Sequence, residues 1–186
     1  HIAQLGFVTS FADDPMTRVR VAGLANGFLL ALAVAATFLL VAALCELQGV
    51  AFTSRLATAA GLSALAYCLS PMFSYLAGNL LSEVPALCLL TLGLLCFTHA
   101  LLRRSTALAA LAGVTLCAVY GVRVDSLLTA LVCSGVIALA ALQRPSRRGL
   151  WRLLLTSVAG AAAAFAVYSA LFHPLTDPRL ILELRQ

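Results

Sequence analysis

Charged residues are scarce in this chain, and lysine is missing altogether. Only 10% of its 186 residues are charged, whereas soluble domains carry roughly 25%. All 12 basic residues are arginine, and hydrophobic residues make up 62% of the sequence. The mean hydropathy is +1.03. A soluble domain of this length could not bury so much apolar surface, so the composition predicts an integral membrane protein.

The chain also lacks the cysteine patterns of disulfide frameworks and zinc sites. Its 6 cysteines all lie inside apolar runs, with no CxxC pair and no histidine at ligand spacing. Thiols that pack as small hydrophobic side chains explain them, so we predict no metal site built from them. The net charge of +5 does not indicate nucleic acid as a partner, because the arginines lie between apolar runs, where topology signals belong.

Six apolar runs have lengths that suit membrane helices. About 19 residues at 1.5 Å each give roughly 28 Å, enough to cross the hydrocarbon core. Leu and Ala dominate, and no run alternates as a transmembrane strand does, so we predict an all-α, polytopic helix bundle. The predicted spans are 21–45, 56–73, 84–102, 105–121, 126–143 and 153–172. Residues 1–19 would end one outer loop and 174–186 would begin another. The absence of an initiator Met suggests a fragment of a longer protein.

The arginines predict the orientation of these spans. If the connections alternate sides, the side with the Arg-Pro-Ser-Arg-Arg-Gly loop at 144–149 holds more arginines and should be cytoplasmic. Among the acidic residues, only Glu46 falls on that side. Acidic residues carry little topological weight, so a reactive face on the outer side would explain their asymmetry. The exclusive use of arginine suggests a GC-rich genome and hence a bacterial inner membrane.

Two patterns of small residues predict close helix packing. Gly23 and Gly27 form a GxxxG motif, and small residues recur every four positions from Ser105 to Gly121. Such stripes let helix backbones approach closely and gain dispersion contacts. The second stripe would carry Arg123 into the bundle interior at the outer surface.

Two charged pairs interrupt this apolar sequence on the predicted outer side. They are Ser82-Glu83, at the head of one run, and Arg123-Val-Asp125, between two others. Ionisable groups at the hydrocarbon boundary cost about a few kcal/mol each and often mark a functional pocket. A purely structural alternative exists for each pair. Ser82 and Glu83 suit a helix start, and Arg123 and Asp125 suit a local salt bridge.

Three further polar residues lie near the ends of the predicted spans. Tyr75 and Asn79, just ahead of the first pair, are candidates for lining a pocket, although tyrosine at a membrane interface is ordinary anchoring. His99, one helical turn before Arg103, is predicted to be an interfacial residue that extends toward the head groups.

The order of several short motifs resembles a known family. Residues 66–85 contain a Ser-Pro step and then the Ser-Glu step, and a Leu-rich helix ending in Arg103-Arg104 follows. Leu111-Ala-Gly-Val then precedes Arg123-Val-Asp. This series is similar to the middle of the GT-C glycosyltransferases of the protein mannosyltransferase and aminoarabinose transferase type, over about residues 18–172.

The chain departs from that family in two places. The family's key aspartate lies early in the first large outer loop, and Asp13 and Asp14 lie too near the next helix to match it. The family's Arg-Pro step is Arg123-Val here.

The resemblance implies a membrane enzyme that moves a sugar from a polyprenyl-phosphate donor to an acceptor on the non-cytoplasmic face. A carboxylate would remove the acceptor proton, and a guanidinium would stabilise the leaving phosphate. The implied catalytic residues are Glu83 and Asp125, and the implied lipid-phosphate contacts are Arg123, Tyr75, Asn79 and Ser82.

The cofactor and the other function classes stay open. A divalent cation is one way to neutralise the leaving group. The expected partners are the polyprenyl-phosphate sugar, the bilayer and a glycan, lipid or protein acceptor. A multi-pass transporter, with these charges lining its path, and a non-catalytic membrane subunit remain alternatives.

Overall fold

The structure, a computed structural model, describes residues 15–68, 83–122, 126–142 and 149–172, and all regular structure in these ranges is α-helical. The prediction of an all-α chain is therefore confirmed for the described residues. The helices are α2 (Pro15–Gln48), α3 (Ser54–Cys68), α5 (Glu83–Arg103), α6 (Thr106–Val122), α7 (Ser126–Leu142) and α8 (Leu150–Phe172).

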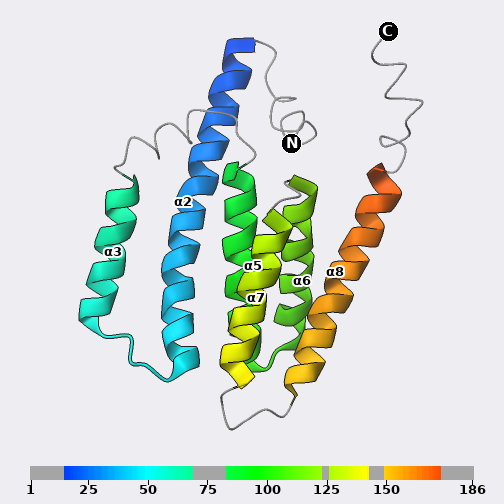
Figure 1. The fold of residues 1–186 in the computed structure, drawn as a ribbon. Coiled ribbons are helices and arrows are strands. Elements are labelled where there is room, and N and C mark those ends of the chain that lie inside the picture. The colour runs from blue at the N-terminus through cyan, green and yellow to red at the C-terminus, as the bar shows by residue number, and fades with distance from the viewer. Residues whose placement is uncertain (1–14, 69–82, 123–125, 143–148, 173–186) are drawn as a thin grey trace.

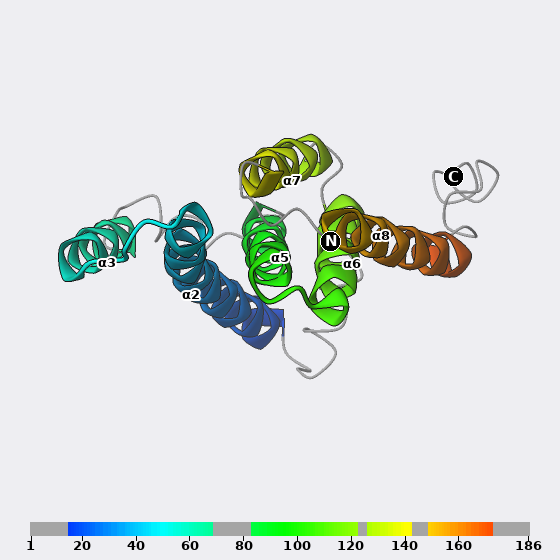
Figure 2. The same ribbon diagram turned by 90° about the horizontal axis from the view of Figure 1, so that it is seen from below.

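Successive helices run in opposite directions, so the molecule has two ends (Figure 1). We call them the Glu83 end, where α5 begins, and the Arg103 end, where α5 finishes. In the perpendicular view α5 lies between α2 and α6, and α8 packs on the far side of α6 (Figure 2). α7 covers α5 and α6 from one face, and α3 stands at the edge beside α2 (Figure 2).

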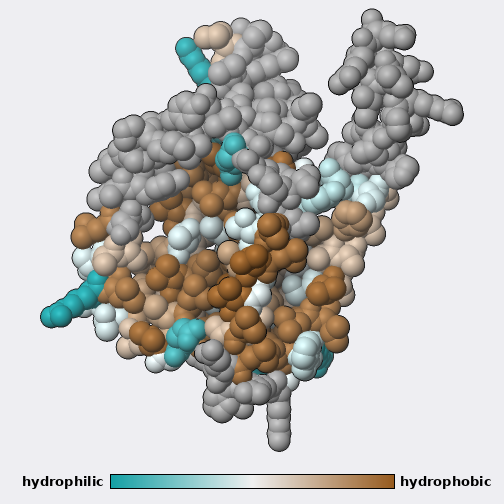
Figure 3. Space-filling view, in the orientation of Figure 1, coloured by the Kyte–Doolittle hydropathy of each residue, from teal (hydrophilic) through white to brown (hydrophobic). Residues whose placement is uncertain are grey.

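Three of these helices are long and apolar enough to cross a membrane. The candidate spans are Arg20–Gln48, Glu83–Arg103 and Leu150–Ala170. Two further helices are apolar but shorter, over Thr106–Val122 and Leu128–Leu142. Large hydrophobic side chains are exposed along several helices, and the described part of the visible surface is mostly hydrophobic (Figure 3). These features fit a membrane protein, while the prediction of six crossings stays a prediction.

Capping residues explain where the helices stop at the Arg103 end. Gly49, with a φ of 73°, follows α2, and its N–H donates to the carbonyl of Glu46 at 3.1 Å. The N–H of Val50 donates to the carbonyl of Cys45 at 2.9 Å, which completes a Schellman motif. The α5–α6 turn repeats this geometry with a non-glycine residue, because Arg104 has a φ of 53°.

The predicted span boundaries agree with the helices to different degrees. The predicted spans 84–102, 105–121 and 126–143 lie within a residue or two of α5, α6 and α7. The first span, 21–45, lies inside the much longer α2, which has 34 residues. α3 accounts for 56–68 of the second span, and the rest of that span lies outside the described residues.

Of the two small-residue patterns predicted to mediate close helix packing, the one in α6 does so. In α6, a Cβ placed on Gly113 would overlap the backbone carbonyl of Ser157 in α8. From the α8 side, a Cβ on Gly160 would lie 2.5 Å from the carbonyl oxygen of Ala110. The stripe in α6 therefore permits close backbone packing, as predicted.

The GxxxG prediction is wrong within the described part of the chain. A Cβ on Gly23 or Gly27 would meet nothing within 4 Å there. Leu24 and Phe28, each of which follows one of these glycines, are 75% and 70% exposed. The motif makes a flat helix face, but no described helix covers it.

Candidate functional site

One predicted site residue, Glu83, falls within the described residues. It is the first residue of α5 and is exposed, whereas Val84 and Ala86 just after it are 1% and 3% exposed. The carboxylate therefore stands where α5 enters the packed bundle. An acidic side chain in the first helical turn is also favoured by the helix dipole. The other predicted site residues, Tyr75, Asn79, Ser82, Arg123 and Asp125, lie outside the described residues.

The helix ends on either side of Arg123 and Asp125 lie at the Glu83 end. The tight turn at Arg104 makes α5 and α6 antiparallel neighbours, so α6 finishes at Val122 near the end where α5 begins (Figure 1). α7 starts from the same end at Ser126. The structure thus brings the start of α5 and the helix ends bordering 123–125 to one end of the bundle.

A buried amide at this end was not among the predicted site residues. Asn26 of α2 is 6% exposed, in a stripe of otherwise apolar buried residues. α2 and α5 run in parallel, and Glu46 and His99 line one pocket between them. Leu30 precedes Glu46 by as many residues as Glu83 precedes His99, so Leu30 lies at about the same height in the bundle as Glu83. Asn26 lies one helical turn beyond Leu30, toward the start of α2. The signal available in the sequence was a single amide inside a long apolar run.

An apolar groove lies at mid-depth in the bundle. Its cavity volume is about 440 Å³, within the range of small-ligand pockets. Small residues of three helices hollow it out, and the hydroxyl of Ser134 is buried in it without a hydrogen-bond partner in the described structure. The lining residues are Phe97 of α5, Gly113, Leu116 and Cys117 of α6, Ala130, Leu131 and Ser134 of α7, and Leu154, Ser157, Val158, Ala161, Ala162 and Phe165 of α8.

The lining of this groove suits an apolar chain. It carries no charged side chain, and its polar groups are two serines and a thiol. Leu131, Val158 and Phe165 also have exposed surface, so the groove is continuous with the hydrophobic outside of α7 and α8. An acyl or prenyl chain entering from the bilayer would find a continuous apolar path there.

The described residues contain no group of three or more His, Cys, Asp or Glu side chains that could hold a metal ion. Five cysteines of the described helices are free thiols, namely Cys45, Cys88, Cys96, Cys117 and Cys133. The acidic residues predicted near the outer surface, other than Glu83, lie outside the described ranges.

Comparison with known proteins gave no match: no protein-family model, no curated protein and no solved structure matches this chain.

Proposed function

We propose that this chain is part of an integral-membrane glycosyltransferase that moves a sugar from a polyprenyl-phosphate donor to an acceptor on the non-cytoplasmic face. In this proposal all six helices cross the bilayer. α6 and α7 have 17 residues each, which gives about 26 Å at 1.5 Å per residue. They would span a core of roughly 30 Å with slight local thinning of the bilayer.

The common position of the charged segments is the observation that carries the proposal. Glu83 begins α5 at the same end of the bundle where α6 finishes before Arg123 and α7 begins after Asp125. Arg103 and Arg104 lie at the opposite end of α5. This arrangement supports a site on the non-cytoplasmic face, because the arginine-rich end is the one expected in the cytoplasm.

Each charged residue has a chemical role in the proposed transfer. The Glu83 carboxylate removes the proton of the attacking hydroxyl as the bond from the acceptor oxygen to the sugar C1 forms. The bond from C1 to the phosphate oxygen breaks, and the guanidinium of Arg123 stabilises the charge on that phosphate. Asp125 orients Arg123, and Tyr75, Asn79 and Ser82 complete the head-group pocket.

The groove among α6, α7 and α8 accounts for the rest of the donor. A polyprenyl chain is far longer than the sugar phosphate and must remain in an apolar environment. The groove offers about 440 Å³ of mainly apolar space below the Glu83 end. This groove supports the proposal because the first isoprene units can lie in it while the phosphate reaches the surface.

Glycosyl transfer by the full-length protein in proteoliposomes tests the proposal. The donors are radiolabelled polyprenyl-phosphate mannose and polyprenyl-phosphate aminoarabinose, offered with membranes that supply acceptors. We expect Glu83→Gln to lower transfer by about 100-fold or more, the range for loss of a general base. Glu83→Asp keeps the charge at the helix start and should retain part of the activity.

Membrane insertion separates catalysis from helix capping. Glu83 is exposed, so Gln should leave insertion and yield unchanged apart from a helix-dipole term of about 0.3–1 kcal/mol. Full transfer by inserted Glu83→Gln protein would exclude the catalytic role. Absence of transfer by the wild-type protein with both donors, together with measurable solute flux, would favour a transporter.

A further inference from the structure

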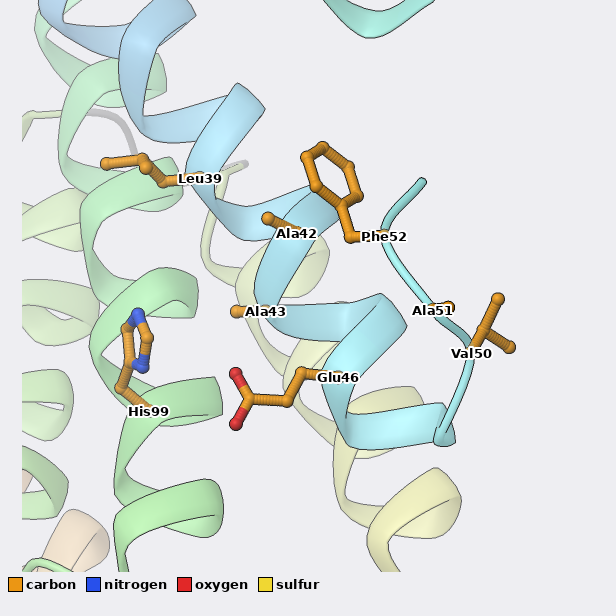
Figure 4. Close-up of a pocket in the computed structure, with 8 residues that line it drawn as sticks. All are labelled: Leu39, Ala42, Ala43, Glu46, Val50, Ala51, Phe52 and His99. Atoms are coloured by element: carbon orange, nitrogen blue, oxygen red, sulfur yellow. The ribbon is translucent and has the colours of Figure 1, made fainter. Parts of the chain in front are cut away.

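A second pocket lies at the Arg103 end, away from the proposed transfer site. Its cavity volume is about 450 Å³, and it opens between the last turns of α2, the segment after α2 and His99 of α5 (Figure 4). Ala42 and Ala43 of α2 leave the space that larger side chains would fill. Only two of its lining residues, Glu46 and His99, have ionisable side chains.

The wall formed by residues 50–52 is held against α2 by specific contacts. The left-handed Gly49 and the hydrogen bond from the N–H of Val50 to Cys45 turn the chain back at the end of α2. The ring of Phe52 then packs edge-on against Phe38, with 5.8 Å between centroids. The pocket is therefore a feature of the folded chain and not a gap between loosely associated helices.

The polar groups of the pocket face one another across it. His99 extends from α5 toward α2, and the Glu46 carboxylate extends from α2 toward α5 (Figure 4). The Nδ1 atom of His99 is buried and has no hydrogen-bond partner in the described structure. The sequence predicted a histidine that extends toward the head groups, and in the structure its side chain lines this pocket near the end of α5.

A buried nitrogen without a hydrogen-bond partner destabilises the protein, so a ligand that donates a hydrogen bond to it is favoured. A carboxylate accepts hydrogen bonds only, and one ammonium group brings three N–H donors, enough for both Glu46 and His99. The remaining walls, such as Leu39 and Phe52, are apolar. The lining therefore suits a ligand with a primary ammonium on an apolar body.

The position of the pocket identifies the source of such a ligand. Glu46 lies in the last turn of α2, a candidate membrane span, and His99 lies one turn before the end of α5, another candidate span. The end of a membrane-spanning helix lies at the depth of the lipid head groups, so the pocket would face the head groups of one leaflet. Arg103 follows His99 by four residues and so lies on the same face of α5, where its guanidinium can reach a phosphate next to the ammonium.

We propose that the Glu46–His99 pocket binds the head group of a zwitterionic lipid with a primary ammonium, such as phosphatidylethanolamine, from the leaflet at the Arg103 end. The ammonium donates to Glu46 and to Nδ1 of His99, and the phosphate lies toward Arg103. This site rests on the membrane embedding of α2 and α5 but does not depend on glycosyl transfer.

Lipid titration of the purified full-length protein in detergent, followed by native mass spectrometry, tests this site. Phosphatidylcholine is the matched probe, because it has the same phosphate and net charge but no N–H donor. We expect phosphatidylethanolamine to bind about tenfold more tightly or better, since one hydrogen bond to a charged group contributes about 1.5–3 kcal/mol. Equal affinity for the two lipids, or tighter binding of anionic phosphatidylglycerol than of phosphatidylethanolamine, would overturn the proposal.

Three variants and one control locate the site. His99→Leu and Glu46→Gln remove the two partners of the ammonium, and Ala42→Leu fills the cavity without touching either. Each variant should bind phosphatidylethanolamine and phosphatidylcholine with nearly equal affinity. Glu83→Gln, at the opposite end of α5, should keep the full preference even if it abolishes glycosyl transfer.

The stability of the lipid-free protein separates binding from a structural role. His99→Leu removes an unsatisfied buried nitrogen, so the thermal unfolding temperature without added lipid should stay the same or rise. A preference that survives both His99→Leu and Ala42→Leu would exclude this pocket as the lipid site.

Discussion

Glycines at two positions decide how closely α6 approaches α8. Gly113 faces the backbone of Ser157, and Gly160 faces the backbone of Ala110, so each helix presents a glycine to the other's main chain. Without a strong hydrophobic drive between helices in lipid, such close contact is a main source of packing energy. Backbone atoms cannot rotate away as a side-chain tip can, so this contact tolerates no added methyl group.

Replacing one of these glycines provides a test at the residue scale. Gly113→Ala should lower the free energy of unfolding by about 1–3 kcal/mol, as overpacking does, because the new Cβ overlaps the Ser157 carbonyl. The control is Gly135→Ala in α7, where a Cβ meets nothing within 4 Å. It should raise stability by about 0.5–1 kcal/mol through helix propensity. Denaturation in mild detergent, followed by circular dichroism, measures both. Equal effects of the two variants would contradict the packing argument.

The sequence predicts helix ends where charged and small polar residues interrupt the apolar runs. Glu83 and Arg103 mark the two ends of α5, and Ser105 precedes α6 with its hydroxyl accepting from the N–H of Leu108 at 3.4 Å. The start of α2 is less predictable, because the first predicted span begins only after Arg20. An arginine does not stop a helix, and α2 instead begins at Pro15, a residue suited to the first helical position.

Helix pairing was less predictable than helix position. A GxxxG motif shows that a face is flat, not which helix covers it, so Gly23 and Gly27 gave the wrong expectation within the described structure. The common pocket of Glu46 and His99 depends on the parallel alignment of α2 and α5, which are far apart in sequence. No local pattern encodes that alignment. The candidate site has the same limit, because the sequence indicates Glu83 but not the burial of Asn26, one helical turn beyond the level of Glu83.

Charge placed at the centre of α8 tests membrane crossing at the element scale. α8 is a candidate span, and Ala163 lies exposed near its middle. In a bilayer Ala163→Arg should cost about 2.5–3.5 kcal/mol of insertion free energy, because the guanidinium would sit in hydrocarbon. Trp151→Arg, in the first turn of α8 and also exposed, should cost little, since its side chain can reach the head groups. Insertion into microsomes, read by glycosylation tags, measures the difference. Normal insertion of Ala163→Arg would show that α8 does not cross the bilayer.

At the scale of the whole molecule, the alternating helix directions give the chain two chemically different ends. Glu83 lies at one end, together with the helix ends next to 123–125, and Arg103, Arg104 and the Glu46–His99 pocket lie at the other. The proposed sugar transfer and the proposed lipid site would therefore face opposite leaflets. Variants at one end should leave the function of the other intact, so the two proposals can fail independently.

The orientation of these ends in the membrane is the last prediction. Met16 lies exposed at the start of α2, at the Glu83 end, and Ser54 lies exposed at the start of α3, at the Arg103 end. Because the arginine-rich end should be cytoplasmic, Met16→Cys in a cysteine-free background should react with an impermeant maleimide in sealed right-side-out membranes. Ser54→Cys should react only after permeabilisation. The opposite result would place Glu83 in the cytoplasm and exclude transfer on the outer face. Reaction of both cysteines in sealed membranes would mean that α2 does not cross the bilayer, and the lipid proposal would fail with it.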